Sequence, residues 1–327
     1  MKKALTVLIF LSAVSLHVSA QQSDSLVHVQ RLDSLSEPKK DSVALADLNN
    51  FFTHEDSLDI FMLIDSMLKL DLPKDRSMMA VRMAYNSNIL ADNRTFNIDQ
   101  FGLAPGISYY HKTGLYADYS AYWSREFDPH LYLSVGSVGY LKSFGKYYSL
   151  LTEYSHYFYN QPKDSSVYVP YTNNVGITNY FDFKPIVFRL DYYYYFGDKS
   201  AHRIMPSIGL NLVRKKWLGL DRVSIYPTFN VLYGSDDATR YEVYPNLIAR
   251  ILYNRTNTPK LPLIKEINYT VFGVMNYSFS VPITITEKNW SFLLGYTYNF
   301  PRSLQGEDSS LQNSGYLSFS VTRYFDF

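Results

Sequence analysis

The sequence predicts an all-β fold, a transmembrane antiparallel up-and-down β-barrel of about 12–14 strands. Apolar and polar residues alternate over stretches as long as membrane-crossing strands, which need roughly 9–11 residues. Tyr and Phe are abundant, with 31 and 21 residues, as expected for the aromatic girdles of such a barrel. A leader for export and a short helical segment are expected ahead of the barrel.

The leader covers residues 1–20. It opens with two lysines, continues with an apolar run at 4–14, and ends at Ala20 in a small-residue cleavage site. The mature chain is therefore expected to begin at Gln21. The apolar run is too short to stay in a membrane as an anchor.

Charge and composition exclude several classes of protein. Loss of the two leader lysines lowers the formal net charge of +1 to −1, so no basic field attracts nucleic acid. The absence of Cys excludes disulfide frameworks and thiolate metal sites. No later run reaches the roughly 20 apolar residues of a membrane-spanning helix. We expect no cofactor and no metal site.

Residues 21–77 form a separate periplasmic linker, rich in Ser and Asp. Within it, Ser57 is a good N-cap for one amphipathic helix over 58–70. The apolar stripe of this helix recurs at i, i+3, i+4 and i+7, at Ile60, Leu63, Ile64 and Met67. The helix either rests on the periplasmic rim of the barrel or acts as a plug in the lumen or as a docking helix for a partner.

The barrel is expected over 78–327. In 290–300, for example, the aromatic residues share one face and the small polar residues share the other. Alternation marks strands at 78–90, 98–111, 114–124, 129–142, 146–159, 173–183, 185–196, 202–214, 221–234, 241–254, 266–285, 289–300 and 315–327. This is an odd number, whereas single-chain bacterial barrels have an even number.

Two corrections restore an even number. Splitting 266–285 at residues 275–277 gives fourteen strands, and omitting 78–90 gives twelve. Fourteen is preferred, because it keeps 111–114, 143–146 and 182–185 as short periplasmic turns. It also places the longer connections 160–172 and 301–314 outside the cell.

The last strand ends in a polar residue, a small residue and two alternating aromatics, at Ser320, Thr322, Phe325 and Phe327. Here the sequence resembles bacterial outer-membrane β-barrel proteins as a class, although Thr322 replaces the usual Gly. The resemblance implies insertion among outer-membrane lipid with help from the barrel-assembly machinery, which recognises this strand. Arg323 falls on the lipid face, close enough to the end to lie at an interface.

Charged residues are also expected inside the barrel. By alternation they are Arg82, Asp118, Glu153, Asp182, Arg189, Asp191 and Arg250. One interpretation is a set of ion pairs that braces the interior. The other is a selectivity constriction in a pore. Bracing is favoured, because charges of mixed sign without an excess discriminate little between ions.

No catalytic residue is predicted. The nearest approach to a catalytic pair is His156 beside Ser155, and a histidine at the membrane interface explains it better.

Asp-Ser-apolar triplets in the linker resemble the acceptor signal of a bacterial O-glycosylation system. Ser34 and Ser42 are its candidate acceptors, as a minority hypothesis, because Asp-Ser pairs also serve as helix caps.

We therefore expect a non-enzymatic outer-membrane protein with a narrow channel for small solutes, since a barrel this wide can leave a lumen. The alternative is a plugged barrel that acts as a scaffold or a surface contact, and a barrel hydrolase comes third.

Overall fold

The structure is a computed structural model that describes residues 76–87, 102–125, 128–160, 171–256, 258–305 and 311–326. Several expectations fall outside these residues: the leader 1–20, nearly all of 21–77 with its helix at 58–70, Ser34, Ser42 and Phe327. Within the described ranges, no helix is both long and apolar enough to cross a membrane.

Long strands dominate the described part of the chain. In order they are β1 (Met78–Asn86), β2 (Gly102–Tyr110), β3 (Leu115–Ser124), β4 (Leu131–Phe144), β5 (Tyr148–Tyr159), β6 (Tyr171–Phe183), β7 (Ile186–Gly197), β8 (Ser200–Leu210), β9 (Leu212–Trp217), β10 (Leu220–Ile225), β11 (Thr228–Val243), helix α4 (Leu247–Thr256), β12 (Ile264–Glu287), β13 (Trp290–Pro301) and β14 (Ser314–Asp326).

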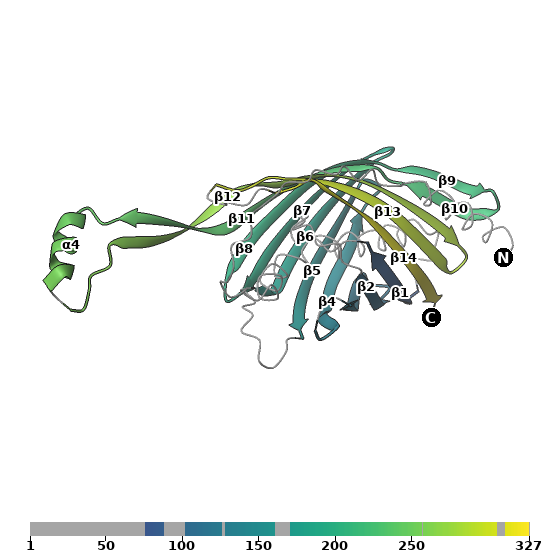
Figure 1. The fold of residues 1–327 in the computed structure, drawn as a ribbon. Coiled ribbons are helices and arrows are strands. Elements are labelled where there is room, and N and C mark those ends of the chain that lie inside the picture. Colours follow the sequence, from purple (N-terminus) through teal and green to yellow (C-terminus); the bar gives the residue numbers. More distant parts are fainter. Residues whose placement is uncertain are drawn as a thin grey trace, which may run out of the picture.

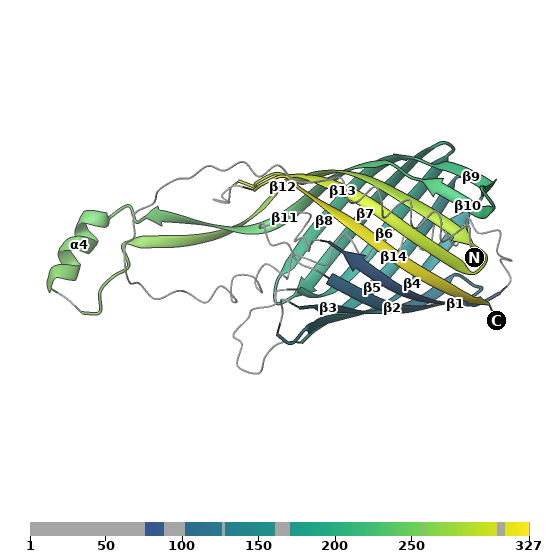
Figure 2. The same ribbon diagram turned by 45° about the vertical axis from the view of Figure 1, so that its right-hand side comes forward.

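Antiparallel pairing closes the sheet into a barrel (Figure 2). Strands β1 to β8 pair in chain order, β8 pairs with β11, and β11 to β14 continue the ring through β12 and β13. The ring is closed where β14 pairs with β1, from Met78 opposite Asp326 to Asn86 opposite Ser318. Strands β9 and β10 form a hairpin outside this ring of twelve, and β10 also pairs with β12.

The two faces of the ring differ in polarity. On β7, Phe188 and Leu190 are exposed on the outer face, whereas Arg189 and Asp191 are buried on the inner face. Exposed apolar residues continue around the outer face at Val81, Met83, Ile107, Leu115, Val138, Ile177, Ile208, Phe229, Phe279 and Leu317. An apolar exterior with a polar interior is the arrangement of transmembrane barrels, and soluble barrels reverse it.

Aromatic residues gather on the outer face near the end of the barrel that carries the C-terminus. The guanidinium of Arg323 lies 5.2 Å from the ring centroid of Trp290 and 5.0 Å from that of Phe325. Tyr147 and Phe183 stack at 6.0 Å beside the neighbouring turns. This environment is what an interfacial arginine requires.

The preferred strand number of fourteen is wrong for the ring, which has twelve strands. The error lies at 241–254: β11 ends at Val243 and residues 247–256 are helical. Ile248, Ile251 and Leu252 have the i, i+3, i+4 spacing of a helix, and Pro245 ends the strand. The region 78–90 does supply a strand, β1. The predicted short turns lie between the expected strands, at 111–114, 145–147 and 184–185.

The predicted split of 266–285 is also wrong, because β12 runs unbroken from Ile264 to Glu287. A bulge explains the irregular pattern: Leu232 pairs with Asn276 and Tyr233 pairs with Val274. Met275 is the extra residue, so Met275 and Asn276 are both buried. The sequence signal taken for a turn is therefore a bulge.

Strands β11 and β12 continue far beyond the ring (Figure 1). Strand β8 pairs with β11 only as far as Gly234, and β13 pairs with β12 only from Asn276. The described residues of 236–274 therefore form a separate ribbon with α4 at its tip, which we call the arm. It projects from the end of the barrel opposite the C-terminus.

Candidate functional site

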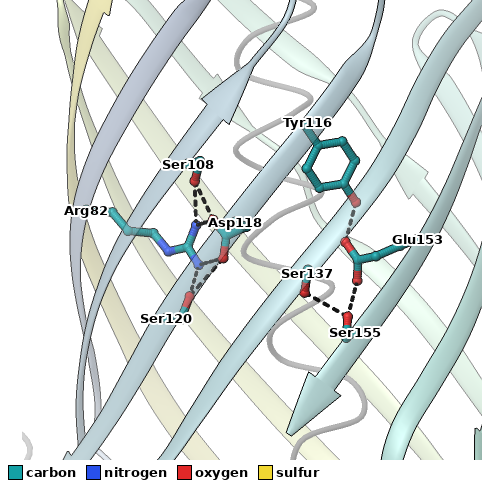
Figure 3. Close-up of polar contacts among 8 residues, drawn as sticks. All are labelled: Arg82, Ser108, Tyr116, Asp118, Ser120, Ser137, Glu153 and Ser155. Carbon is teal, nitrogen blue, oxygen red and sulfur yellow. Dashed lines mark hydrogen bonds and ion pairs between the residues drawn. The ribbon is translucent and has the colours of Figure 1, made fainter. Parts of the chain in front are cut away.

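The first cluster inside the ring centres on an ion pair between β1 and β3 (Figure 3). Arg82 donates from Nη1 to Asp118 Oδ1 at 2.8 Å and from Nη2 to Oδ2 at 2.9 Å. Ser108 and Ser120 also donate to the carboxylate, and both accept from Arg82. Gly106 on the intervening strand makes room, since a Cβ there would lie 2.9 Å from Arg82 Nε. The result is a buried, two-pronged pair of the strong type.

A second cluster surrounds the carboxylate of Glu153 on β5 (Figure 3). The hydroxyl of Tyr116 donates to Glu153 Oε2, and that of Ser155 donates to Oε1 at 3.0 Å. Ser155 also bonds to Ser137 on β4, at 2.7 Å. Hydroxyl groups rather than a cation therefore hold this carboxylate.

Two glycines make room for aromatic rings on the strands around Glu153. Tyr116, Gly139, Glu153, Gly176 and Tyr193 are paired in register across β3 to β7. A Cβ on Gly139 would lie 2.5 Å from the Tyr116 ring, and one on Gly176 would lie 2.5 Å from the Tyr193 ring. Each ring thus occupies the space above a glycine.

The third cluster is the ion pair of Arg189 and Asp191 on β7. Arg189 Nε lies 2.9 Å from Asp191 Oδ2, and both side chains are buried. Arg189 also reaches Ser207 on β8 at 3.5 Å. Together the three clusters line the inner face from β1 to β8, and we call this side the charge-paired wall.

The structure brings five of the seven predicted lumen charges into these clusters. Asp182 lies near the end of β6, and its carboxylate is 3.9 Å from the exposed Lys184. The placement of Arg250 was wrong, because it belongs to α4 in the arm rather than to a barrel strand. There its guanidinium lies over the ring of Tyr244 at 3.6 Å.

Two buried arginines were missed by the sequence reasoning. Arg203 on β8 donates to the backbone carbonyls of His202 and Ser235, and Arg222 on β10 is also buried. Alternation could have identified Arg203, since Ile208 and Leu210 place the outer face at even positions of β8. Within the described strands, the fully buried charges are therefore four arginines and two aspartates, and the carboxylate of Glu153 is partly buried.

The inner face of β11 to β13 carries a different set of residues. We call this set the amide wall, and it consists of Asn230, Asn276, Ser278 and Asn299. Asn230 donates to Ser278 at 3.1 Å, and Asn276 donates to Asn299 at 3.0 Å. Asn230 Oδ1, Asn276 Oδ1 and Asn299 Nδ2 have no hydrogen-bond partner among the described residues. The three asparagines are at most 1% exposed, and their unpartnered atoms comprise two acceptors and one donor.

Ser155 and His156 do not form a catalytic pair. Ser155 is buried inside the ring, whereas His156 lies on the opposite face of β5 and bonds to Asn173 at 2.7 Å. Among the described residues, no group of three or more His, Asp or Glu could hold a metal ion. At the chain end, Ser320 and Thr322 face inward on β14, and their role in assembly remains a prediction.

No family model and no curated protein matches this sequence. Solved barrel structures do match. The KdgM porin aligns over 75% of this chain and 99% of its own, with 9% identity and a TM-score of 0.42. The NanC porin aligns over 75% and 98%, with 12% identity and a TM-score of 0.37. The translocator domain of autotransporter NalP from Neisseria meningitidis aligns over 88% and 98%, with 10% identity and a TM-score of 0.38.

The matched structures belong to the class that the sequence resembles, the bacterial outer-membrane β-barrel proteins. The closed barrel itself is established by the strand pairing of this chain.

The hydroxyl of Tyr116 gives a direct test of the Glu153 cluster. We expect Tyr116→Phe to lower the free energy of unfolding by about 2 kcal/mol, because the buried carboxylate loses a charge-assisted hydrogen bond. Denaturant unfolding of the refolded protein, followed by Trp fluorescence, measures this change. The matched control is Tyr119→Phe on the outer face of the same strand; an equal loss in both variants would show that the Glu153 bond has no special role.

Proposed function

We propose that this chain is a non-enzymatic outer-membrane β-barrel protein that gives small polar solutes a narrow path through the membrane. The apolar outer face and the aromatic residues near the barrel end support its placement in lipid. Passage is proposed along the amide wall, and the charge-paired wall braces the other side.

The observation that carries the proposal is the set of unpartnered amide atoms. A buried polar atom without a hydrogen bond costs about 1–3 kcal/mol, so three such atoms on adjacent strands favour contact with water or a polar solute. Amides offer donors and acceptors without charge. Because the buried arginines and carboxylates are of mixed sign, we expect weak discrimination between cations and anions.

A scaffold is the second candidate. Two features support it. The buried ion pairs would close much of the lumen, and a surface-contact protein would use the long arm. A plug formed by residues 58–70 would also favour it. Both candidates are compatible with recognition of β14 by the barrel-assembly machinery.

Single-channel recording in a planar bilayer tests the proposal. We compare the mature chain with a variant that lacks residues 21–77, and we expect stable steps with a reversal potential near zero in a KCl gradient. The double variant Asn276→Leu/Asn299→Leu should lower the conductance, whereas the matched control Ser137→Ala on the charge-paired wall should not.

Each other outcome has a defined meaning. Silence of both chains would reject the channel in favour of the scaffold. Steps only in the shortened variant would show that the N-terminal segment plugs the lumen. Strong ion selectivity, or equal conductance in the leucine double variant, would reject the amide wall as the path.

A further inference from the structure

The arm carries a helix away from the rest of the protein. In Figures 1 and 2, α4 lies at the tip of the ribbon, far from the ring. On β11 the arm runs from Asp236 to Val243, a length of about 25 Å at ~3.3 Å per residue. The tip therefore stands clear of the barrel that holds it.

The helix at the tip is held in shape by its own loop. Asn254 donates from Nδ2 to the carbonyl of Leu261 at 2.8 Å, and accepts from the amide of Leu261 at 2.7 Å. Arg250 donates to the carbonyl of Pro262 at 2.8 Å and covers Tyr244. An isolated helix of this length is marginal in water, so these contacts fix one face of α4 and leave the other outward.

The outward face of α4 is apolar. Ile248 is 75% exposed and Leu252 is 56% exposed, with Ile251 and Tyr253 exposed beside them. Ile248, Ile251 and Leu252 fall on one helix face at i, i+3 and i+4. Exposure of such a stripe on a projecting helix indicates a contact surface rather than a core.

Between Glu242 and Glu266, the charge around this stripe is positive. From Val243 to Lys265 the sequence contains Arg250, Arg255, Lys260 and Lys265 and no Asp or Glu. Two copies of the tip would therefore repel each other, whereas an anionic surface would attract them. A basic helix with an exposed apolar stripe is the pattern of helices that lie in a lipid interface.

We propose that the tip of the arm docks onto an anionic lipid surface other than the lipid that surrounds the barrel. Ile248 and Leu252 enter the boundary between headgroups and acyl chains, while Arg255, Lys260 and Lys265 contact anionic headgroups. This docking is independent of whether the barrel conducts.

Vesicle flotation tests the docking. The mature chain is held in nanodiscs of neutral phosphatidylcholine and mixed with vesicles of phosphatidylcholine, with or without about 30% phosphatidylglycerol. We expect binding to the anionic vesicles only, lost at about 1 M salt, where the Debye length is ~3 Å.

Two double variants separate the apolar and the charged contributions. Ile248→Asp/Leu252→Asp should weaken binding by at least about 100-fold, because two buried apolar side chains are lost. Lys260→Gln/Lys265→Gln should weaken it roughly 30-fold. The matched control is Leu218→Asp, since Leu218 is 64% exposed in the β9–β10 turn at the other end; it should bind as the unmodified chain does.

Three results would overturn the proposal. The first is equal binding to neutral and anionic vesicles, or to neither. The second is binding to the soluble polyanion heparin that Ile248→Asp/Leu252→Asp leaves unchanged, which would indicate a polyanion rather than lipid. The third is concentration-dependent dimerisation in sedimentation velocity that the same variant abolishes, which would make a second copy the occupant.

Discussion

Asp118→Ala is expected to lower the free energy of unfolding by about 3–5 kcal/mol, the largest effect of any substitution considered for this barrel. The change removes the two-pronged ion pair of Asp118 with the guanidinium of Arg82, whose side chain is only 7% exposed. Equilibrium unfolding in detergent micelles or lipid vesicles measures the loss.

Two further variants identify the cause. The double variant Arg82→Met/Asp118→Leu removes both charges, and we expect it to recover most of the stability. Glu242→Ala breaks the exposed pair of Arg240 and Glu242 in the arm, which are 2.7 Å apart, and should cost less than about 1 kcal/mol. If the double variant is as unstable as Asp118→Ala, the cost comes from lost packing and not from the lost ion pair.

Gly139→Ala is expected to destabilise the barrel by about 2–3 kcal/mol through overpacking. The new Cβ would lie 2.5 Å from the backbone oxygen of Thr152 and 2.5 Å from the Tyr116 ring. Because the backbone oxygen cannot move aside, removal of the ring by Tyr116→Ala should not rescue this variant. The same unfolding measurement applies.

Gly176 and Gly136 provide the comparison. At Gly176 the nearest atoms all belong to the Tyr193 ring, so Gly176→Ala should cost about 1–2 kcal/mol and Tyr193→Ala should rescue it. A Cβ on Gly136 would meet only Phe158, at 3.6 Å, so Gly136→Ala should be neutral or slightly stabilising. Equal effects at all three glycines would mean that strand propensity, not the rings, sets the cost.

Alternation in the sequence was sufficient to predict the barrel, the short turns and the inward face of most buried charges. An apolar outer face and a polar inner face impose the same period of two on every strand. The helix within 241–254 was not predicted, because apolar residues at alternate positions of that stretch also fit a strand. Only the helical spacing of Ile248, Ile251 and Leu252 distinguishes it. The bulge at Met275 shifts the period by one residue, which resembles a turn when the partner strand is unknown.

Pairing partners could not be predicted in the same way. Alternation places Arg82 and Asp118 on the inner face, but their contact crosses β2 and depends on a register that brings Gly106 between them. The open amide atoms of Asn276 and Asn299 likewise depend on the register of β12 and β13. The register of three neighbouring strands decides which polar atoms remain without a hydrogen-bond partner. The sequence of a single strand does not contain this information.

Because β11 and β12 are longer than the other strands, the ring and the arm differ in the free energy needed to open them. In the ring every strand has a neighbour on each side, so opening one strand breaks two ladders of hydrogen bonds. In the arm, β11 and β12 pair only with each other, and each leaves an open edge of backbone groups. A two-stranded ribbon is marginal on its own, so the arm opens locally at a small free-energy cost while the ring stays intact. A protease could therefore cut away the tip and leave a complete barrel behind.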